Sequence, residues 1–312
     1  MKKLLMTLAL SATSFLYANV NAVVSILPQE TFLKKIGGDK VNISLMVKPG
    51  HSPHTYEPKP SQMKDISKAD VYFSIGVEFE HTWLSKFSNQ NSNMLISDMN
   101  KNIHKIAIAE HSHHDHEEEH GHDEHADEHE KHDDHDKHDE HGHNEHEDEH
   151  HEDSQDPHTW LSPSNVKIMA QNIFDTLVKI DSKNTEYYKH NLENFLKEIN
   201  TTDKTIKKLL QNTPKHSKFM VFHPSWGYFA KNYDLEQFAI ESGGKNPKPK
   251  QIAFLIEEAK EENIKAVFTA PEFSTKAADQ IAKEVGIPVV KVSPLSANWS
   301  ENLIKFAKGI SK

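Results

Sequence analysis

Three histidines of this 312-residue chain occur in short sequences that share a proline and a nearby aromatic residue. They are His54 in HSPHTYEP, His158 in DPHTWLSP and His223 in FHPSWGYF. Proline restricts the backbone beside each imidazole, and bulky aromatic side chains favour a dry, stiff surround for a ligand. Three neutral imidazoles with a fourth position left for water or a carboxylate suit Zn²⁺. Taken singly, each histidine also fits a plainer role, in a solvent-facing loop, at a helix start or at a strand end.

The pattern of apolar runs predicts two parallel sheets that bring these histidines together. Short apolar runs alternate with amphipathic stretches, which is typical of α/β folds. The predicted strands are 23–27, 41–47, 71–75 and 94–97, then 219–222, 237–240, 266–269 and 288–292. His54 follows the strand at 41–47, His223 follows the strand at 219–222, and His158 lies in the crossover between the two groups. Ligands of such sheets bind beyond the carboxyl ends of the strands, so we expect the three side chains at one cleft.

Two helices are predicted between the two groups of strands. The first covers 163–179, and a longer one starts at Asp181 or Ser182 and ends before Pro214. About 28 residues at 1.5 Å each span roughly 40 Å, enough to cross a domain. The predicted fold class is therefore α/β: two similar lobes with parallel sheets (βαβαβαβ), joined by one long rigid helix, with the metal site in the interlobe cleft. In the first lobe, Ser61 is expected to cap a helix that runs to about Lys68.

The predicted fold divides the chain into four regions. Residues 1–22 are predicted to be a signal peptide, 23–162 an N-terminal lobe, 163–213 the helical connection and 214–312 a C-terminal lobe. Between 110 and 156 the chain holds 22 Asp or Glu, 2 Lys and 16 of the 24 His. Such a segment cannot bury enough apolar surface to form a core, so we predict a disordered insertion in the first lobe. Its many imidazoles favour weak, exchanging sites for Zn²⁺, Ni²⁺ or Cu²⁺, in a scavenging or buffering role.

The N-terminus predicts export. Lys2 and Lys3 precede a mostly apolar stretch and then small residues, which is typical of a secretory signal peptide, with cleavage expected after Ala18 or Ala22. The chain has no cysteine, so we expect no disulfide, no thiolate ligand and no lipid-modified cysteine. These features predict a soluble protein of the periplasm of a Gram-negative cell.

The charge distribution argues against nucleic-acid binding. With histidine neutral, the segment 110–156 carries a net charge of −20. Because the whole chain carries −11, the remainder carries +9, and all of its basic residues are lysine. No basic stripe with interleaved aromatic residues is present.

A zinc hydrolase is the alternative of a different class, because three histidines and a water also form catalytic zinc sites. Such an enzyme needs a general base beside the bound water. Glu272, after the strand at 266–269, is the one well-placed candidate, and the chain has neither a His-Glu-x-x-His nor a Gly-x-Ser-x-Gly motif.

Four motifs carry a resemblance to a known family: PGHSPHTYEPKPSQ, DPHTWLSP, FHPSWGYFAKNY and VSPLSANWSENL. In this order they resemble the substrate-binding proteins of metal ABC transporters, in particular the zinc-uptake branch. The resemblance implies two α/β lobes and one divalent ion between them, and it places the metal ligands at His54, His158 and His223. It also implies an aspartate ligand in the last strand-to-helix turn, where this chain has Ser293. The fourth ligand is therefore open: a water, Glu272 or a histidine of the insertion.

The resulting prediction is a periplasmic zinc-binding protein that delivers Zn²⁺ to the inner-membrane permease of an ABC importer. We expect it to be monomeric and to catalyse nothing. Manganese-binding relatives of the resembled family usually have a carboxylate where this chain has His223, which disfavours Mn²⁺. Nickel is the alternative ion that is hardest to exclude from the residues alone.

Overall fold

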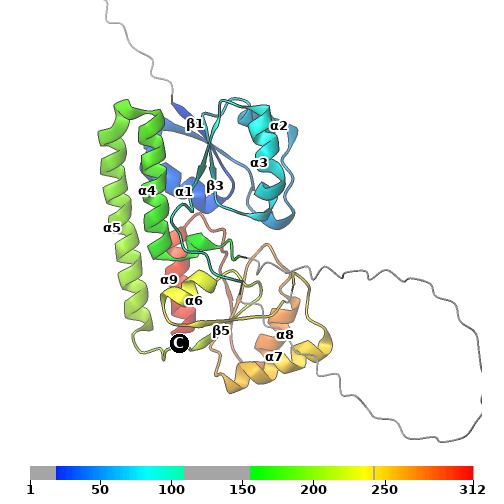
Figure 1. The fold of residues 1–312 in the computed structure, drawn as a ribbon. Helices are drawn as coiled ribbons and strands as arrows, with labels where there is room; N and C mark the ends of the chain where they lie inside the picture. Colours follow the sequence, from blue (N-terminus) through cyan, green and yellow to red (C-terminus); the bar gives the residue numbers. More distant parts are fainter. Residues whose placement is uncertain (1–18, 109–154, 242, 312) are drawn as a thin grey trace, which may run out of the picture.

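The computed structural model describes residues 19–108, 155–241 and 243–311, which form two lobes stacked end to end (Figure 1). The N-terminal lobe contains β1 Val20–Val24, α1 Leu27–Gly37, β2 Val41–Leu45, α2 Pro60–Ile66, β3 Val71–Ser74, α3 Glu78–Gln90 and β4 Leu95–Asp98. All its strands are parallel, in the order β2-β1-β3-β4. The parallel arrangement directs the carboxyl ends of all four strands to one edge of the sheet.

The C-terminal lobe repeats this arrangement. It contains β5 Lys218–Val221, α6 Gly227–Asn232, β6 Glu236–Ala239, α7 Pro249–Glu261, β7 Val267–Thr269, α8 Lys276–Val285, β8 Val289–Lys291 and α9 Trp299–Ile310. Its strands are again parallel, in the order β6-β5-β7-β8, so the second strand of each lobe precedes the first in the sheet. The prediction of two similar α/β lobes with parallel sheets is confirmed.

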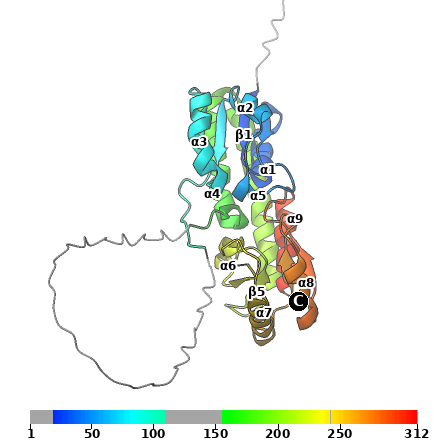
Figure 2. The same ribbon diagram turned by 90° about the vertical axis from the view of Figure 1, so that its right-hand side faces the viewer.

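Two antiparallel helices, α4 Pro163–Ile180 and α5 Thr185–Leu210, join the lobes. At 1.5 Å per residue the 26 residues of α5 measure roughly 39 Å, and the helix runs along both lobes (Figures 1 and 2). Its buried side chains recur every three or four residues and pack against α4 and α1 at one end and α9 at the other: Tyr188, Leu192, Phe195, Ile199, Thr202, Ile206 and Leu210. One apolar core therefore continues from one lobe into the other.

Two buried tryptophans add hydrogen bonds between the lobes. The indole N–H of Trp160 donates to the carbonyl of Pro294 at 2.8 Å, and that of Trp299 donates to the carbonyl of Trp160 at 2.7 Å. Both rings are almost fully buried. The segment that follows His158 is thus bonded to the C-terminal lobe, which limits how far the lobes can separate without breaking buried hydrogen bonds.

Local details differ from the sequence predictions at the start of α2 and at the bounds of β1. Ser61 lies inside α2 and does not cap it, because the N-cap is Lys59 and Pro60 occupies the first helical position, where a missing N–H has no cost. Strand β1 starts three residues earlier than predicted and ends at Val24, because α1 already begins at Leu27 with Pro28 in its first turn. Within the described ranges no helix combines the length and apolarity needed to cross a bilayer.

Candidate metal centre

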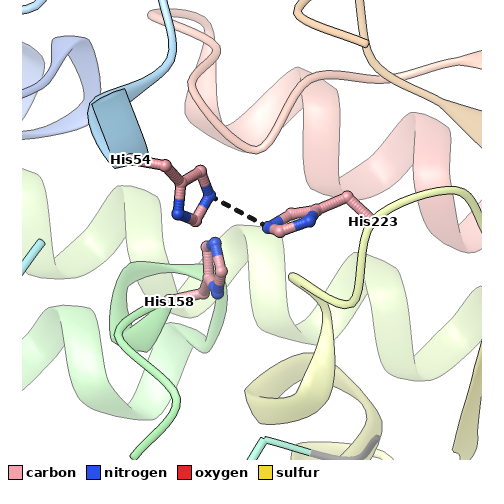
Figure 3. A group of neighbouring side chains, drawn as sticks. All are labelled: His54, His158 and His223. Atoms are coloured by element: carbon pink, nitrogen blue, oxygen red, sulfur yellow. Dashed lines mark hydrogen bonds between the residues drawn. The ribbon is translucent and has the colours of Figure 1, made fainter. Parts of the chain in front are cut away.

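His54, His158 and His223 converge between the lobes from three separate segments (Figure 3). One potential ligand atom from each lies within 4.8 Å of the others, and this is the only such group of three or more among the described residues. The Nε2 atoms of His54 and His223 are 3.1 Å apart. Ligands of a tetrahedral zinc ion with bonds of about 2.0–2.1 Å lie roughly 3.3 Å apart, so this spacing fits a shared ion.

Each of these histidines is positioned by a short local structure. His54 lies in the 3₁₀ turn Pro53–Thr55 beyond the carboxyl end of β2, and the hydroxyl of Ser52 accepts a hydrogen bond from its backbone N–H. His158 precedes the 3₁₀ turn Thr159–Leu161, and its backbone N–H donates to the carboxylate of Asp156. His223 comes two residues after β5. The carboxyl-end rule therefore accounts for His54 and His223.

The other ring nitrogen of each histidine faces a carboxylate. The Nδ1 atom of His54 lies 2.8 Å from Glu78, that of His158 lies 2.8 Å from Asp156 and that of His223 lies 2.5 Å from Glu241. A carboxylate at Nδ1 holds the proton there, which orients the ring and leaves the lone pair of Nε2 free to bind a cation. This pairing supplies the orienting shell that a metal site of three imidazoles requires.

None of these three carboxylates was predicted from the sequence. Glu241 follows β6 just as His223 follows β5, and Glu78 begins α3 shortly after β3, so the carboxyl-end rule could have found both. Asp156 is two residues before His158 and was counted within the acidic insertion 110–156. In the structure Gln155 and Asp156 belong to the fold, and Asp156 is 1% exposed. The remainder of the predicted insertion, 110–154, lies outside the described residues.

The electrostatic surroundings of His54 and His223 differ. Burial disfavours the charged form of both imidazoles. For His54, the hydrogen bond to Glu78 and the negative charges of Glu78 and Glu241 together outweigh burial and raise its pKa. For His223, burial prevails over the hydrogen bond that its Nδ1–H donates to Glu241, and the charges of the neighbouring imidazoles His158 and His54 act in the same direction as burial, so the pKa of His223 is lowered. Of these two imidazoles, His54 therefore takes up a proton more readily than His223.

Only one of the aromatic residues expected beside the histidines lies against its imidazole. Trp160 is fully buried beside His158, with ring centroids 5.3 Å apart, and Phe273 stacks on His223 at 4.7 Å. Trp226 instead stacks on Phe306 in the C-terminal core at 3.7 Å. Of the aromatic residues expected to form a dry surround for the histidines, only Trp160 does so. Phe273 was not predicted, because it lies 50 residues from His223 in the chain.

The expected fourth-ligand candidates lie apart from the three imidazoles. The Ser293 hydroxyl donates to one oxygen of Glu272 at 2.9 Å. The other oxygen of Glu272 is buried and has no hydrogen-bond partner among the described residues. Glu272 does not belong to the group of residues whose atoms could share an ion. A histidine of the insertion, the remaining protein candidate, lies outside the described residues.

Two α/β lobes, each with a parallel sheet, and a cluster of imidazoles between them define a solute-binding protein of the metal-binding class. The chain belongs to the ZnuA family, described as the periplasmic component A of the zinc-uptake complex, whose family model matches residues 22–308.

Individual relatives agree with this assignment. The zinc-binding protein AdcA of Streptococcus pyogenes serotype M3 is 30% identical over 280 residues, which cover 88% of this chain and 50% of AdcA. The high-affinity zinc uptake system protein ZnuA of Bacillus subtilis is 30% identical over 271 residues, covering 86% of this chain and 76% of that protein. A crystal structure of a ZnuA deletion mutant with zinc bound superposes with a TM-score of 0.75 at 36% identity, covering 94% of this chain and 97% of the other. The chain thus spans half the length of AdcA.

Proposed function

We propose that this protein is the periplasmic zinc-binding component of a zinc ABC importer, which captures Zn²⁺ with His54, His158 and His223 and delivers it to the inner-membrane permease. The observation that carries the proposal is the mutual approach of three imidazoles, each held at Nδ1 by its own carboxylate. The named zinc-binding relatives support the choice of ion.

The donor set favours zinc over manganese. Imidazole nitrogens suit Zn²⁺ and Ni²⁺, whereas Mn²⁺ prefers carboxylate and carbonyl oxygens. The carboxylates of Glu78, Asp156 and Glu241 are hydrogen-bonded to the imidazole Nδ1 atoms. They therefore balance the charge of the ion through the imidazoles and do not coordinate it directly. A tetrahedral set of three imidazoles and one exchangeable ligand, such as water, favours zinc over nickel, because zinc commonly adopts this geometry.

We expect no catalysis at this centre. The hydrolase alternative requires Glu272 to act on a metal-bound water, but its carboxylate is bonded to Ser293 and lies outside the imidazole group. The chemistry that fits is reversible binding of a cation in a partly buried position.

The cellular setting belongs to the same proposal. We infer that the protein is exported and acts in the periplasm as a soluble monomer. Because the chain holds no cysteine, we also infer that it is not lipid-anchored. Residues 1–18 of the predicted signal peptide lie outside the described residues, and the scavenging role of the insertion stays a prediction for the same reason.

A metal competition experiment tests the proposal. The demetallated protein is titrated with Zn²⁺, Ni²⁺ and Mn²⁺ against a chromophoric chelator, in full length and with residues 112–152 deleted. We expect one tight site that prefers Zn²⁺ and survives the deletion. Loss of all tight binding in the deleted protein would show that the insertion, and not the interlobe centre, holds the ion.

A further inference from the structure

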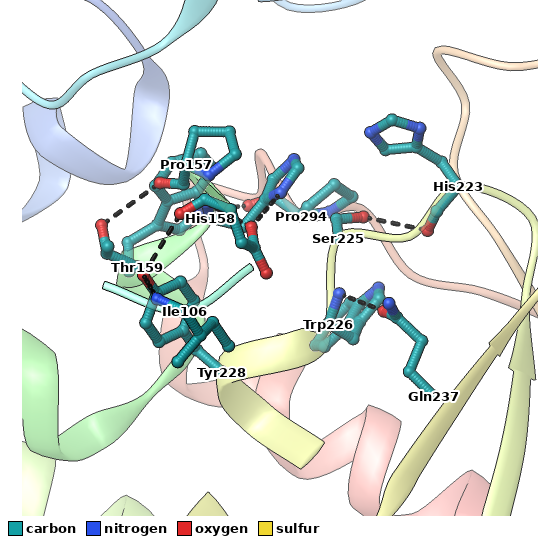
Figure 4. Close-up of polar contacts among 12 residues, drawn as sticks. Ile106, Pro157, His158, Thr159, His223, Ser225, Trp226, Tyr228, Gln237 and Pro294 are labelled. Carbon is teal, nitrogen blue, oxygen red and sulfur yellow. Dashed lines mark hydrogen bonds and ion pairs between the residues drawn. The ribbon is translucent and has the colours of Figure 1, made fainter. Parts of the chain in front are cut away.

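The first residues of α6 in the C-terminal lobe lie against Asp156, the residue whose carboxylate is hydrogen-bonded to His158. The hydroxyl of Tyr228 accepts a hydrogen bond from the backbone N–H of Ile106 and donates one to the carbonyl oxygen of Asp156, both at 3.2 Å (Figure 4). Ile106 and Asp156 also bond to each other, because the N–H of Asp156 donates to the Ile106 carbonyl at 2.8 Å. Tyr228 is 4% exposed, so these contacts are shielded from solvent.

The neighbouring residue, Gly227, faces the side chain of Asp156. One carboxylate oxygen of Asp156 accepts from both the backbone N–H and the Nδ1 of His158, each at 2.8 Å. Its other oxygen is buried without a hydrogen-bond partner among the described residues. A Cβ atom at position 227 would lie 2.7 Å from that second oxygen, which is closer than real contacts allow. Any side chain at 227 would therefore force either the Asp156 carboxylate, which is hydrogen-bonded to His158, or the backbone at 227 to move.

The segment that makes these contacts also carries a ligand and is itself firmly held. His223 lies four residues before Gly227, and the backbone N–H of Trp226 donates to the Gln237 side chain at 2.6 Å, which ties the segment to β6. The Trp226 ring stacks on Phe306 of α9. One short stretch, 223–228, thus presents His223 to the centre and fixes the residue that orients His158.

We propose that Gly227 and Tyr228 are positioning residues for the metal centre, which hold the Asp156–His158 pair in register with His223. This inference rests on the proposed function. Neither residue contributes an atom to the imidazole group, so they act through Asp156. Their role is to set the relative placement of two ligands that come from different segments, and the affinity and coordination geometry of the centre depend on that placement.

Two substitutions and two matched controls test this role. Tyr228→Phe removes the hydroxyl. Tyr233→Phe is its control, because the Tyr233 hydroxyl donates a hydrogen bond to Asp203 at 3.0 Å and does not contact the centre. Gly227→Ala introduces the clash with Asp156, and Gly309→Ala is its control, since a Cβ there would meet the Phe268 ring at 2.6 Å in the same lobe. Zinc affinity is measured by chelator competition, coordination geometry by the visible spectrum of the Co²⁺-loaded protein, and folding by thermal unfolding without metal.

We expect Tyr228→Phe, which loses both hydrogen bonds of the hydroxyl, to weaken zinc binding by about 2- to 10-fold. Gly227→Ala should weaken binding by about 10- to 100-fold, as for loss of a ligand's outer partner. Both should alter the Co²⁺ spectrum, whereas the controls should leave affinity and spectrum unchanged while lowering the unfolding temperature at least as much. If Gly227→Ala fails to fold, Tyr228→Phe decides alone.

Unchanged affinity and an unchanged Co²⁺ spectrum in Tyr228→Phe would overturn the inference, as would controls that weaken binding equally. A wild-type protein without a tight zinc site would contradict the proposed function and this inference together. A tight wild-type site retained by both variants would overturn only the inference.

Discussion

The Nε2 atoms of His54 and His223 lie 3.1 Å apart, although 169 residues separate them in the chain. Each ring has its Nδ1 at a carboxylate, Glu78 for one and Glu241 for the other. If both Nδ1 atoms carry protons, the two Nε2 lone pairs face each other, which is unfavourable unless a proton or a metal ion lies between them. A cation placed between the two rings would remove this repulsion.

Removing one imidazole should abolish tight binding. In His54→Ala the centre keeps two imidazoles, so zinc affinity should fall by more than the roughly 10- to 100-fold expected for loss of an outer partner. His51→Ala is the control, because His51 is exposed in the same loop and lies outside the imidazole group. Isothermal titration with a competing chelator measures both, and equal affinities would remove His54 from the site.

Neutralising a carboxylate behind a ligand should weaken binding without removing it. Glu241→Gln keeps the size of the side chain but loses the charge that holds the proton at Nδ1 of His223, so we expect an affinity about 10- to 100-fold lower. Glu236→Gln is a matched control, because Glu236 pairs with the exposed Nδ1 of His216 at 3.1 Å. A Glu241→Gln protein with wild-type affinity would show that the pairing does not tune the centre.

Zinc affinity should decrease as the pH falls, because an imidazole must lose its proton at Nε2 before it can bind the ion. The raised pKa of His54 places the onset of this competition above the ordinary histidine value of 6.5. Apparent affinities measured from pH 8 down to pH 5 should therefore already fall above pH 6.5. Affinity that stays constant from pH 8 to pH 6 would contradict the assignment of the raised pKa to a ligand.

A buried carboxylate in the N-terminal lobe should make stability depend on pH. Glu80 is 1% exposed and accepts hydrogen bonds from Ser25 and from the backbone N–H groups of Ile75 and Gly76. Burial outweighs these bonds and raises the pKa of Glu80 from 4.5 to about 7. The folded state therefore binds this proton more tightly than the unfolded state.

The contribution of that proton is fully present below pH 4.5 and is lost as the pH rises to about 7. Its size is up to about 3 kcal/mol in the free energy of unfolding. Urea unfolding of the metal-free protein at several pH values measures it as the difference between wild type and Glu80→Gln. A difference that does not change between pH 4.5 and pH 7 would refute the raised pKa.

The structure favours one of the two expected signal-peptide cleavage sites. Val20, Asn21 and Ala22 belong to β1, which pairs with both β2 and β3 in the N-terminal sheet. Cleavage after Ala22 would remove three of the five residues of this central strand, whereas cleavage after Ala18 leaves it whole. We expect the mature protein isolated from the periplasm to begin at Asn19, which its intact mass will show. A mature chain that begins at Val23 would contradict this prediction.

The amino-acid sequence by itself determined the fold class and drew attention to the histidines. Alternating apolar runs are a local signal, and they predict parallel strands whose carboxyl ends meet at one edge, which was sufficient to single out His54 and His223. His158 stood out from the preceding histidines through its proline and its tryptophan neighbour, and Trp160 does pack beside it.

Only the tertiary structure decided which carboxylate orients each imidazole and which aromatic ring covers it. The carboxyl-end rule places Glu78 and Glu241 at the same sheet edges as the histidines, but it does not say which histidine each one pairs with. Phe273 approaches His223 from 50 residues away in the chain, and no local periodicity records such a contact. Asp156 is the clearest case. Its neighbours in sequence are acidic and polar, so composition grouped it with the insertion, yet packing against Gly227 and Tyr228 buries it. Composition averages over a segment, whereas burial is a property of one side chain and of what the fold places against it.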